Sequence, residues 1–106
     1  MNKSAINKYL SICRKANYLI IGADNLKNYH KKLYLIVIYG ETTKNISKVV
    51  LDKLQEYSIP CIAAKEPFSE AIGAVNCKIV GVKNKGLADE ILQQVNEYTH
   101  FREDNV

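Results

Sequence analysis

The stretch Leu19–Asn28 brings polar side chains together directly after a short apolar run. Gly22 ends that run, and Ala23, Asp24 and Asn25 follow it at the expected start of a helix. The first backbone N–H groups of a helix lack intrahelical partners, so such a start tolerates anions and hydrogen-bonding ligands. Asparagine supplies a donor and an acceptor, whereas an ionised aspartate supplies acceptors only. The spacing is compatible with a polar binding surface, and an ordinary helix start without a ligand is the alternative.

The residue types that serve catalysis do not form a recognisable group in this chain. Gly81–Gly86 has the spacing of a phosphate-binding loop, but Leu87 stands where such a loop requires lysine. Glu66 and Glu70 are four residues apart, yet no third group is placed to orient them for acid–base chemistry. His30 has no evident partner, and no Ser–His or Cys–His arrangement is recognisable. We therefore expect a protein that is not an enzyme.

The three cysteines, Cys13, Cys61 and Cys77, are widely spaced, and each stands among apolar residues. Their odd number and spacing argue against a disulfide framework and a metal site, so we expect buried small hydrophobic side chains and no cofactor. The chain has neither a signal-peptide pattern nor an apolar run of membrane-spanning length. We therefore expect a cytoplasmic protein without a membrane partner.

Basic residues are concentrated in the first part of the chain. Residues 1–65 carry 11 Lys/Arg and 4 Asp/Glu, a net charge of +7, whereas residues 66–106 carry a net charge of −3. Such asymmetry suggests a polyanionic partner, first of all a nucleic acid, although lysine-rich helices are also an ordinary solvated surface. Because 13 of the 15 basic residues are lysines, we expect contacts to phosphates rather than base recognition by arginine.

Apolar periodicity and capping residues predict helices that alternate with strands. The expected elements are a helix 4–16 capped by Ser4, a strand 18–21, a helix 23–32, a buried strand 33–39, a helix capped by Thr42 or Thr43 with an apolar stripe from Ile46 to Tyr57, a strand 60–63, a short helix from Pro67 closed by Gly73, a strand 78–82 and a helix from Gly86 to Tyr98. This alternation predicts one α/β domain over residues 1–106, with helices on both faces of a sheet and a frayed tail at 98–106.

Four short motifs recur in the order found in one known family. They are Gly22 after Leu19–Ile21, the polar stretch Gly40–Asn45, the segment Pro60–Lys65 that begins with proline, and Phe68–Gly73, which ends in Ile-Gly. With these motifs, about residues 5 to 98 resemble the kink-turn RNA-binding superfamily of archaeal- and eukaryotic-type large-subunit ribosomal proteins. The resemblance is closest to the bacterial single-domain branch. It implies a three-layer α/β/α sandwich around a four-stranded mixed sheet.

The resemblance also implies an RNA-binding surface made of three neighbouring segments. In the family, the start of the second helix meets tandem sheared G·A pairs in a sharply bent internal loop, and the loop after the third strand covers a flipped nucleotide. The stretch after the second strand lines the same groove. The matching positions are Gly22, Ala23, Asp24, Asn25, Asn28, Glu41, Ile62, Ala63, Ala64 and Lys65. Phosphate contacts are expected from Lys27, Lys31, Lys44 and Lys65.

The chain departs from the family pattern at the second helix. The usual Asn-Glu pair is Asp24-Asn25, and the usual basic position is Asn28, so Lys27 or Lys31 would have to replace the missing cation. Loss of the glutamate removes an anionic acceptor for guanine N–H groups, and charge-assisted hydrogen bonds are about twice as strong as neutral ones.

Two functions remain open from the sequence. The first is a monomeric, non-catalytic RNA-binding protein, associated with the ribosome or with another kink-turn-like RNA and with a possible protein partner in a ribonucleoprotein. The second is a protein-interaction domain of the same fold that has lost specific RNA binding. The altered second helix is the feature that favours the second function.

Overall fold

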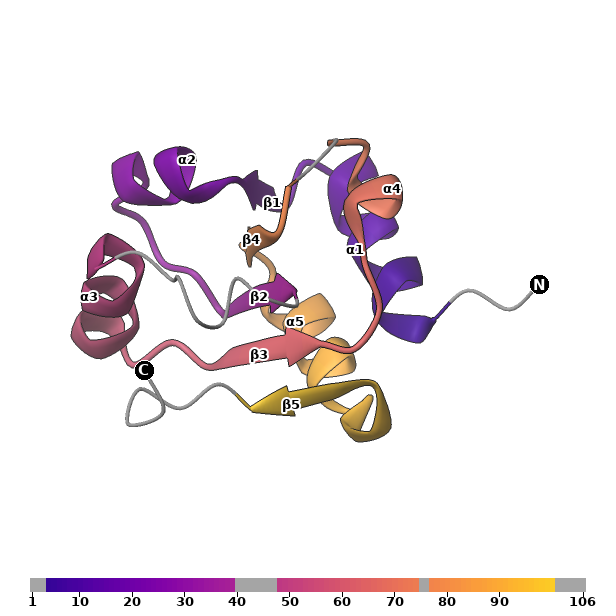
Figure 1. Ribbon diagram of the computed structural model, residues 1–106. Helices are drawn as coiled ribbons and strands as arrows, with labels where there is room; N and C mark the ends of the chain where they lie inside the picture. The colour runs from indigo at the N-terminus through magenta and orange to yellow at the C-terminus, as the bar shows by residue number, and fades with distance from the viewer. Residues whose placement is uncertain (1–3, 40–47, 75–76, 101–106) are drawn as a thin grey trace.

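The computed structural model describes residues 4–39, 48–74 and 77–100, whose arrangement is shown in Figure 1. The elements are α1 (Ala5–Lys15), β1 (Leu19–Ile21), α2 (Ala23–Asn28), β2 (Leu35–Tyr39), α3 (Lys48–Tyr57), β3 (Cys61–Ala64), α4 (Ser69–Ile72), β4 (Ile79–Val82), α5 (Lys85–Leu92), the 3₁₀ turn η2 (Val95–Glu97) and β5 (Tyr98–His100). Ser4 caps α1 as expected, since its Oγ accepts a hydrogen bond from the Asn7 N–H at 3.0 Å.

The five strands form one mixed sheet in the order β1-β4-β2-β3-β5. Only the β2–β3 pair is parallel, and the other three pairs are antiparallel. A continuous row of partners runs across four strands, because Ile21 pairs with Val80, Val80 with Val37, and Val37 with Ile62. β1, β2 and β3 therefore run in the same direction, and their carboxyl ends lie at the same edge of the sheet.

Two apolar clusters lie on opposite faces of this sheet, because successive side chains of a strand point to opposite sides. In β2, Leu35 and Val37 belong to the first cluster, whereas Ile36 and Ile38 belong to the second. Helices α1, α4 and α5 contribute to the first cluster, and α2 and α3 contribute to the second. All four of these β2 side chains are fully buried, which confirms the expected central strand.

The sheet has five strands where the sequence predicts four. The apolar spacing of Val95 and Tyr98 was consistent with one long final helix, but α5 ends at Leu92 and the chain turns through η2. The Tyr98 hydroxyl donates a hydrogen bond to the Leu92 carbonyl oxygen at 2.6 Å, and its ring is buried in the first cluster. Tyr98 thus begins strand β5, which pairs with β3 through Ala64, and the frayed tail expected from residue 98 does not begin there.

Other boundaries also differ from the expected ones. α2 ends at Asn28 rather than at residue 32, because Tyr29 has extended backbone angles and Leu26 is the helix's buried residue. α4 begins at Ser69, after a buried Phe68, and it ends at the left-handed Gly73 as expected. The Tyr57 side chain, expected in a buried stripe, is 44% exposed. Thr42, Thr43 and Ile46 lie outside the described residues. No helix within residues 4–39, 48–74 and 77–100 has the length and hydrophobicity to cross a membrane.

The start of α1 is held by a side chain from the other end of the chain. The Glu97 carboxylate accepts hydrogen bonds from the Ala5 N–H at 3.2 Å and from the Ile6 N–H at 3.1 Å. The backbone oxygen of Glu97 also accepts a hydrogen bond from the Lys65 N–H at 2.9 Å. Glu97 therefore connects α1 with the end of β3, and a carboxylate at this position also complements the positive end of the helix.

We expect Glu97→Ala to lower the free energy of unfolding by about 1–3 kcal/mol, because two backbone donors lose a charged acceptor. Glu97→Gln keeps one acceptor oxygen and should lose less. Urea denaturation followed by circular dichroism measures the difference. Glu66→Ala, which removes an exposed acid of the same charge, is the control and should change stability by less than about 0.5 kcal/mol. Equal stability of Glu97→Ala and the wild type would contradict the capping role.

Thiol reactivity tests the two apolar clusters independently. Burial raises the pKa of Cys13 to about 11 and the pKa of Cys61 to about 12, whereas Cys77 is half-buried. Because the thiolate is the reactive form, one thiol per molecule should react with Ellman's reagent at pH 8 in the native protein, and all three should react in denaturant. Rapid reaction of three thiols in the native protein would contradict the packing.

Candidate functional site

The carboxyl ends of β1, β2 and β3 form one edge of the sheet, which we call the carboxyl edge and define by Gly22, Tyr39, Lys65 and Lys78. Gly22 follows β1, and its N–H donates a hydrogen bond to the Ile79 carbonyl oxygen at 3.0 Å. The Tyr39 N–H donates to the Lys78 carbonyl oxygen at 3.0 Å, and Lys65 follows β3. Three strand spacings separate β1 from β3, about 14 Å in all. The expected helix start and the end of the third strand therefore share one edge.

Gly22 has a backbone conformation that excludes other residues. Its angles are φ 90° and ψ 152°, in a region that essentially only glycine occupies. Among the described residues, a Cβ atom added at Gly22 would meet no heavy atom within 4 Å beyond its chain neighbours, and no side chain caps the start of α2. A ligand backbone can therefore approach this turn closely.

Asn25 is held in place by the strand that precedes its helix. Its Nδ2 donates a hydrogen bond to the Ile21 carbonyl oxygen at 2.7 Å. This bond uses one of the two amide hydrogens, so the side chain can still offer a donor and an acceptor to a ligand. Ala23, Asp24 and Asn28, the other α2 residues expected at the site, are also exposed.

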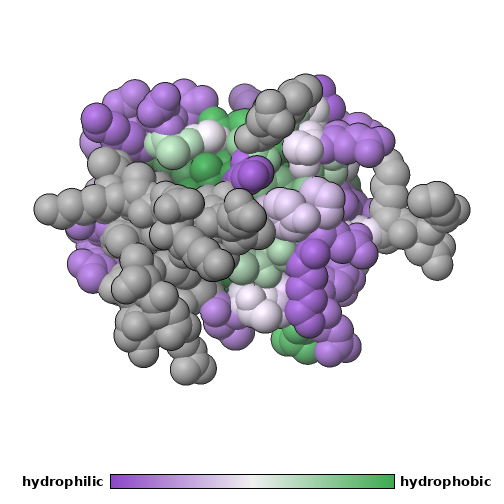
Figure 2. Space-filling view, viewed as in Figure 1, coloured by the Kyte–Doolittle hydropathy of each residue, from purple (hydrophilic) through white to green (hydrophobic). Residues whose placement is uncertain are grey.

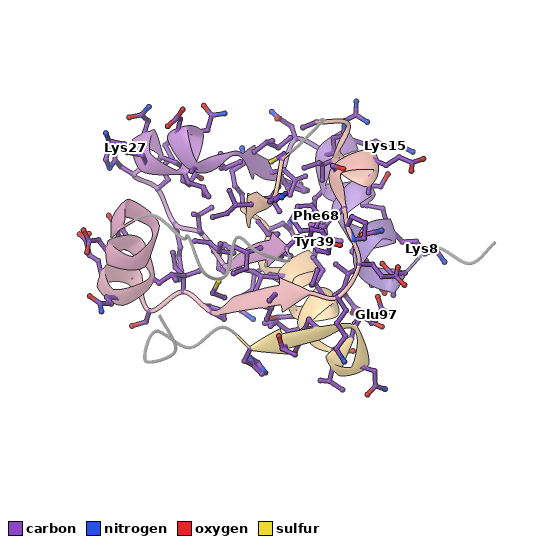
Figure 3. The ribbon with its side chains drawn as sticks, viewed as in Figure 1. Lys8, Lys15, Lys27, Tyr39, Phe68 and Glu97 are labelled. Carbon is purple, nitrogen blue, oxygen red and sulfur yellow. The ribbon has the colours of Figure 1, made fainter. Side chains whose placement is uncertain are left out.

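The two lysines expected to contact phosphates near α2 do not lie at its start. Lys27 is in the last turn of α2, and Figure 3 shows it at the outer end of the helix, away from Tyr39 and Phe68. Lys31 follows after the helix has ended. Since α2 has six residues, it is about 9 Å long. The substitution of Lys27 or Lys31 for the missing basic residue is therefore not supported by their positions.

Three of the residues expected in a loop after the third strand belong to the strand itself. Ile62, Ala63 and Ala64 lie in β3, which ends one residue later than predicted. The Ile62 side chain is fully buried in the first cluster, so it cannot contact RNA as expected. Ala64 is 6% exposed in the same cluster and contributes to the lining of a pocket beside Lys65. Ala63 is half-buried against the second cluster. Lys65 is the exposed residue at this end of β3.

Glu41 and Lys44, the remaining expected site residues, lie outside the described residues.

The structure adds two residues that the sequence reasoning missed. Lys78 is exposed and precedes β4, the strand that lies between β1 and β2, so its position is central on the carboxyl edge. Tyr39 ends β2 and makes an edge-to-face contact with Phe68, with ring centroids 6.4 Å apart. Figure 3 shows these two rings side by side near the middle of the view. The importance of Lys78 depends on the strand order, which no local sequence signal specifies.

The surface in this view combines apolar and polar parts. Figure 2 shows hydrophobic residues in its upper middle, between hydrophilic residues of α2 at the upper left and further hydrophilic residues at the right. An open pocket of about 140 Å³ adjoins the carboxyl edge at Lys65, and Ile6, Ala64 and Glu97 are among its lining residues.

Two features bear on the chemistry of the carboxyl edge: metal-binding clusters and groups with shifted pKa values. Within the described residues, no group of three His, Cys, Asp or Glu side chains is placed to hold a metal ion. Besides the buried Cys13 and Cys61, two groups that the structure describes have raised pKa values: partial burial and then the neighbouring Glu90 raise the pKa of Tyr9, and the Asp89 carboxylate raises the pKa of Lys85. Neither group is part of the carboxyl edge.

Comparisons with known proteins show the fold and leave the function open. No protein-family model matches the chain, and a search of curated proteins finds no match. Among solved structures, the chain is similar to a protein with unknown function from Bacillus halodurans C, at 20% sequence identity and a TM-score of 0.77. The similarity covers 90% of this chain and 100% of that one. The chain therefore has a mixed α/β fold that is shared with another protein.

Two glycine-to-alanine substitutions, which we expect to change the free energy of unfolding in different ways, test the turn at Gly22. Gly22→Ala should lower the free energy of unfolding by about 1–3 kcal/mol, because alanine must adopt a strained backbone conformation although its Cβ meets no neighbour. Gly86→Ala, in the helix α5, should leave stability unchanged or raise it by up to about 1 kcal/mol. Thermal unfolding measures both changes. Tolerance of alanine at Gly22 would show that this turn is not constrained as described.

Proposed function

We propose that this chain is a non-catalytic RNA-binding protein of the kink-turn type, built as a three-layer α/β/α sandwich and acting as a cytoplasmic monomer on ribosomal or other structured RNA. The observation that carries the proposal is the shared carboxyl edge. Gly22 and Lys65 follow strands that are not adjacent in the sheet, yet both lie at that edge. A single bent RNA can therefore contact the start of α2 and the end of β3 together.

In this proposal, different residues of the carboxyl edge contact different parts of the RNA. The Gly22 turn leaves room for the RNA backbone, and the fixed Asn25 side chain presents a donor and an acceptor to base edges. Lys65 and Lys78 supply the phosphate contacts that the sequence had assigned in part to Lys27 and Lys31. Tyr39 and the pocket beside Lys65 offer apolar surface for an unstacked base.

A protein-interaction domain without specific RNA binding remains the second candidate. Asp24 is exposed in the first turn of α2, and its charge would repel a phosphate that approached the open N–H groups there. Lys27 lies in the last turn of the helix. A basic protein surface would tolerate Asp24 better than an RNA backbone does.

Titration with two labelled RNAs decides between these candidates. One RNA contains a kink-turn, and the other has its sheared G·A pairs replaced by Watson–Crick pairs. The protein should prefer the kink-turn RNA, with a log–log salt slope of about −2, which corresponds to two or three neutralised phosphates. Equal affinity for the two RNAs would favour the protein-interaction domain, and an affinity independent of salt would exclude the phosphate contacts.

Asn25→Ala should weaken binding to the kink-turn RNA by about 5- to 150-fold, equivalent to about 1–3 kcal/mol, if its side chain contacts a base with two hydrogen bonds. Gln93→Ala, at the exposed end of α5, is the control and should leave the affinity unchanged. Fluorescence anisotropy gives the dissociation constants. If Asn25→Ala weakens binding to both RNAs equally, the side chain does not discriminate the bent loop.

A further inference from the structure

The opposite edge of the sheet, where β1 and β2 begin and β4 ends, carries aromatic and basic residues next to one another. The Lys83 N–H donates a hydrogen bond to the Tyr18 carbonyl oxygen at 2.8 Å, and the Tyr34 N–H donates to the Val82 carbonyl oxygen at 2.9 Å. Tyr18, Lys83 and Tyr34 therefore follow one another across three neighbouring strand ends. We call this region the amino edge and define it by Tyr18, Tyr29, Tyr34, Lys31, Lys32 and Lys83.

Lysine ammonium groups lie over the aromatic rings of this edge. Lys32 Nζ is 5.2 Å from the centroid of the Tyr34 ring, and Lys83 Nζ is 5.9 Å from the centroid of the Tyr29 ring. The two contacts come from different segments of the chain, since Lys32 precedes β2 and Lys83 follows β4. Cations and rings are thus gathered here by the fold rather than by one run of sequence.

The lysines of the amino edge differ from the neighbouring Lys85 in their ion pairing. Within the described residues, no ion pair involves Lys31, Lys32 or Lys83. Lys85 lies next to this edge and pairs with Asp89 at 3.0 Å. An unpaired cluster of lysines raises the local concentration of anionic ligands.

Tyr18 is the exposed tyrosine of the amino edge. It is 38% exposed, whereas Tyr29 and Tyr34 are half-buried and pack against the two apolar clusters. The lysine–aromatic contacts involve Tyr34 and Tyr29, so a base that stacks on Tyr18 displaces neither lysine. Two pockets in the described part of the chain, one beside Ser4 and Lys65 and one along α1, contain no residue of the amino edge. Stacking of a base needs only an exposed ring such as that of Tyr18.

We propose that the amino edge binds single-stranded RNA, with a base stacked on Tyr18 and phosphates held by Lys31, Lys32 and Lys83. This surface is independent of the kink-turn proposal, because the five residues of β2 separate the two edges by about 17 Å. One molecule can therefore hold a folded RNA at the carboxyl edge and an unpaired strand at the amino edge.

The direct test is fluorescence anisotropy with a labelled adenylate dodecamer at 50 mM salt. The double variant Lys32→Gln/Lys83→Gln should bind at least tenfold more weakly than the wild type. Its matched control is Lys8→Gln/Lys15→Gln, which also removes two positive charges. Both lysines belong to α1 and are labelled in Figure 3, and their loss should change the affinity less than twofold. Tyr18→Leu should weaken binding by about 5- to 100-fold, whereas Tyr18→Phe, which keeps the ring, should bind like the wild type.

Four outcomes would overturn the proposal. The first two are equal losses of affinity in the two double variants and equal affinities of Tyr18→Leu and Tyr18→Phe. The third is no binding of the adenylate dodecamer at 100 μM protein. The fourth is equally tight binding of a labelled glutamate dodecamer, which would identify an acidic peptide as the ligand. Circular dichroism confirms that each variant is folded. Asn25→Ala should leave the dodecamer affinity unchanged, so this proposal and the kink-turn proposal can fail separately.

Discussion

The burial of β2 on both faces is the constraint on which the rest of the structure depends. The side chains from Leu35 to Ile38 are fully buried, and they alternate between the two apolar clusters. The strand also pairs on both sides, with β4 and with β3. A shift of one residue would move every β2 side chain to the wrong cluster, so the register is strongly specified. That register places the ends of β1, β2 and β3 at the carboxyl edge.

The sequence predicts those elements whose apolar pattern is unambiguous. The run 33–39 is continuous and rich in β-branched residues, so it is recognisable as a central strand before any partner is known. Strand β5 has no such signal, because Thr99 and His100 are polar and exposed and only Tyr98 is buried. Its existence depends on pairing with β3, which is a tertiary interaction. α2 likewise ends at Asn28, where Tyr29 takes extended backbone angles and packs against the second cluster.

The candidate site could be predicted only where one local feature defines it. Gly22 was identifiable because a glycine between a strand and a helix often marks a turn that other residues cannot form. The family resemblance places Ile62 and Ala64 in a loop, although the apolar pattern predicts a strand over 60–63; β3 continues through both residues and buries them. Lys78 was missed because its place on the carboxyl edge depends on β4 lying between β1 and β2. Strand order of this kind is set by long-range pairing.

The central claim is that the carboxyl edge, rather than the surface as a whole, contacts bent RNA. Heteronuclear NMR of the ¹⁵N-labelled protein titrated with a kink-turn RNA tests it most directly. We expect the largest amide shift changes at Gly22, Asn25, Lys65 and Lys78, with a smaller response on the outer face of α5. Shift changes that are absent from these four amides, or that are spread evenly over the molecule, would contradict it.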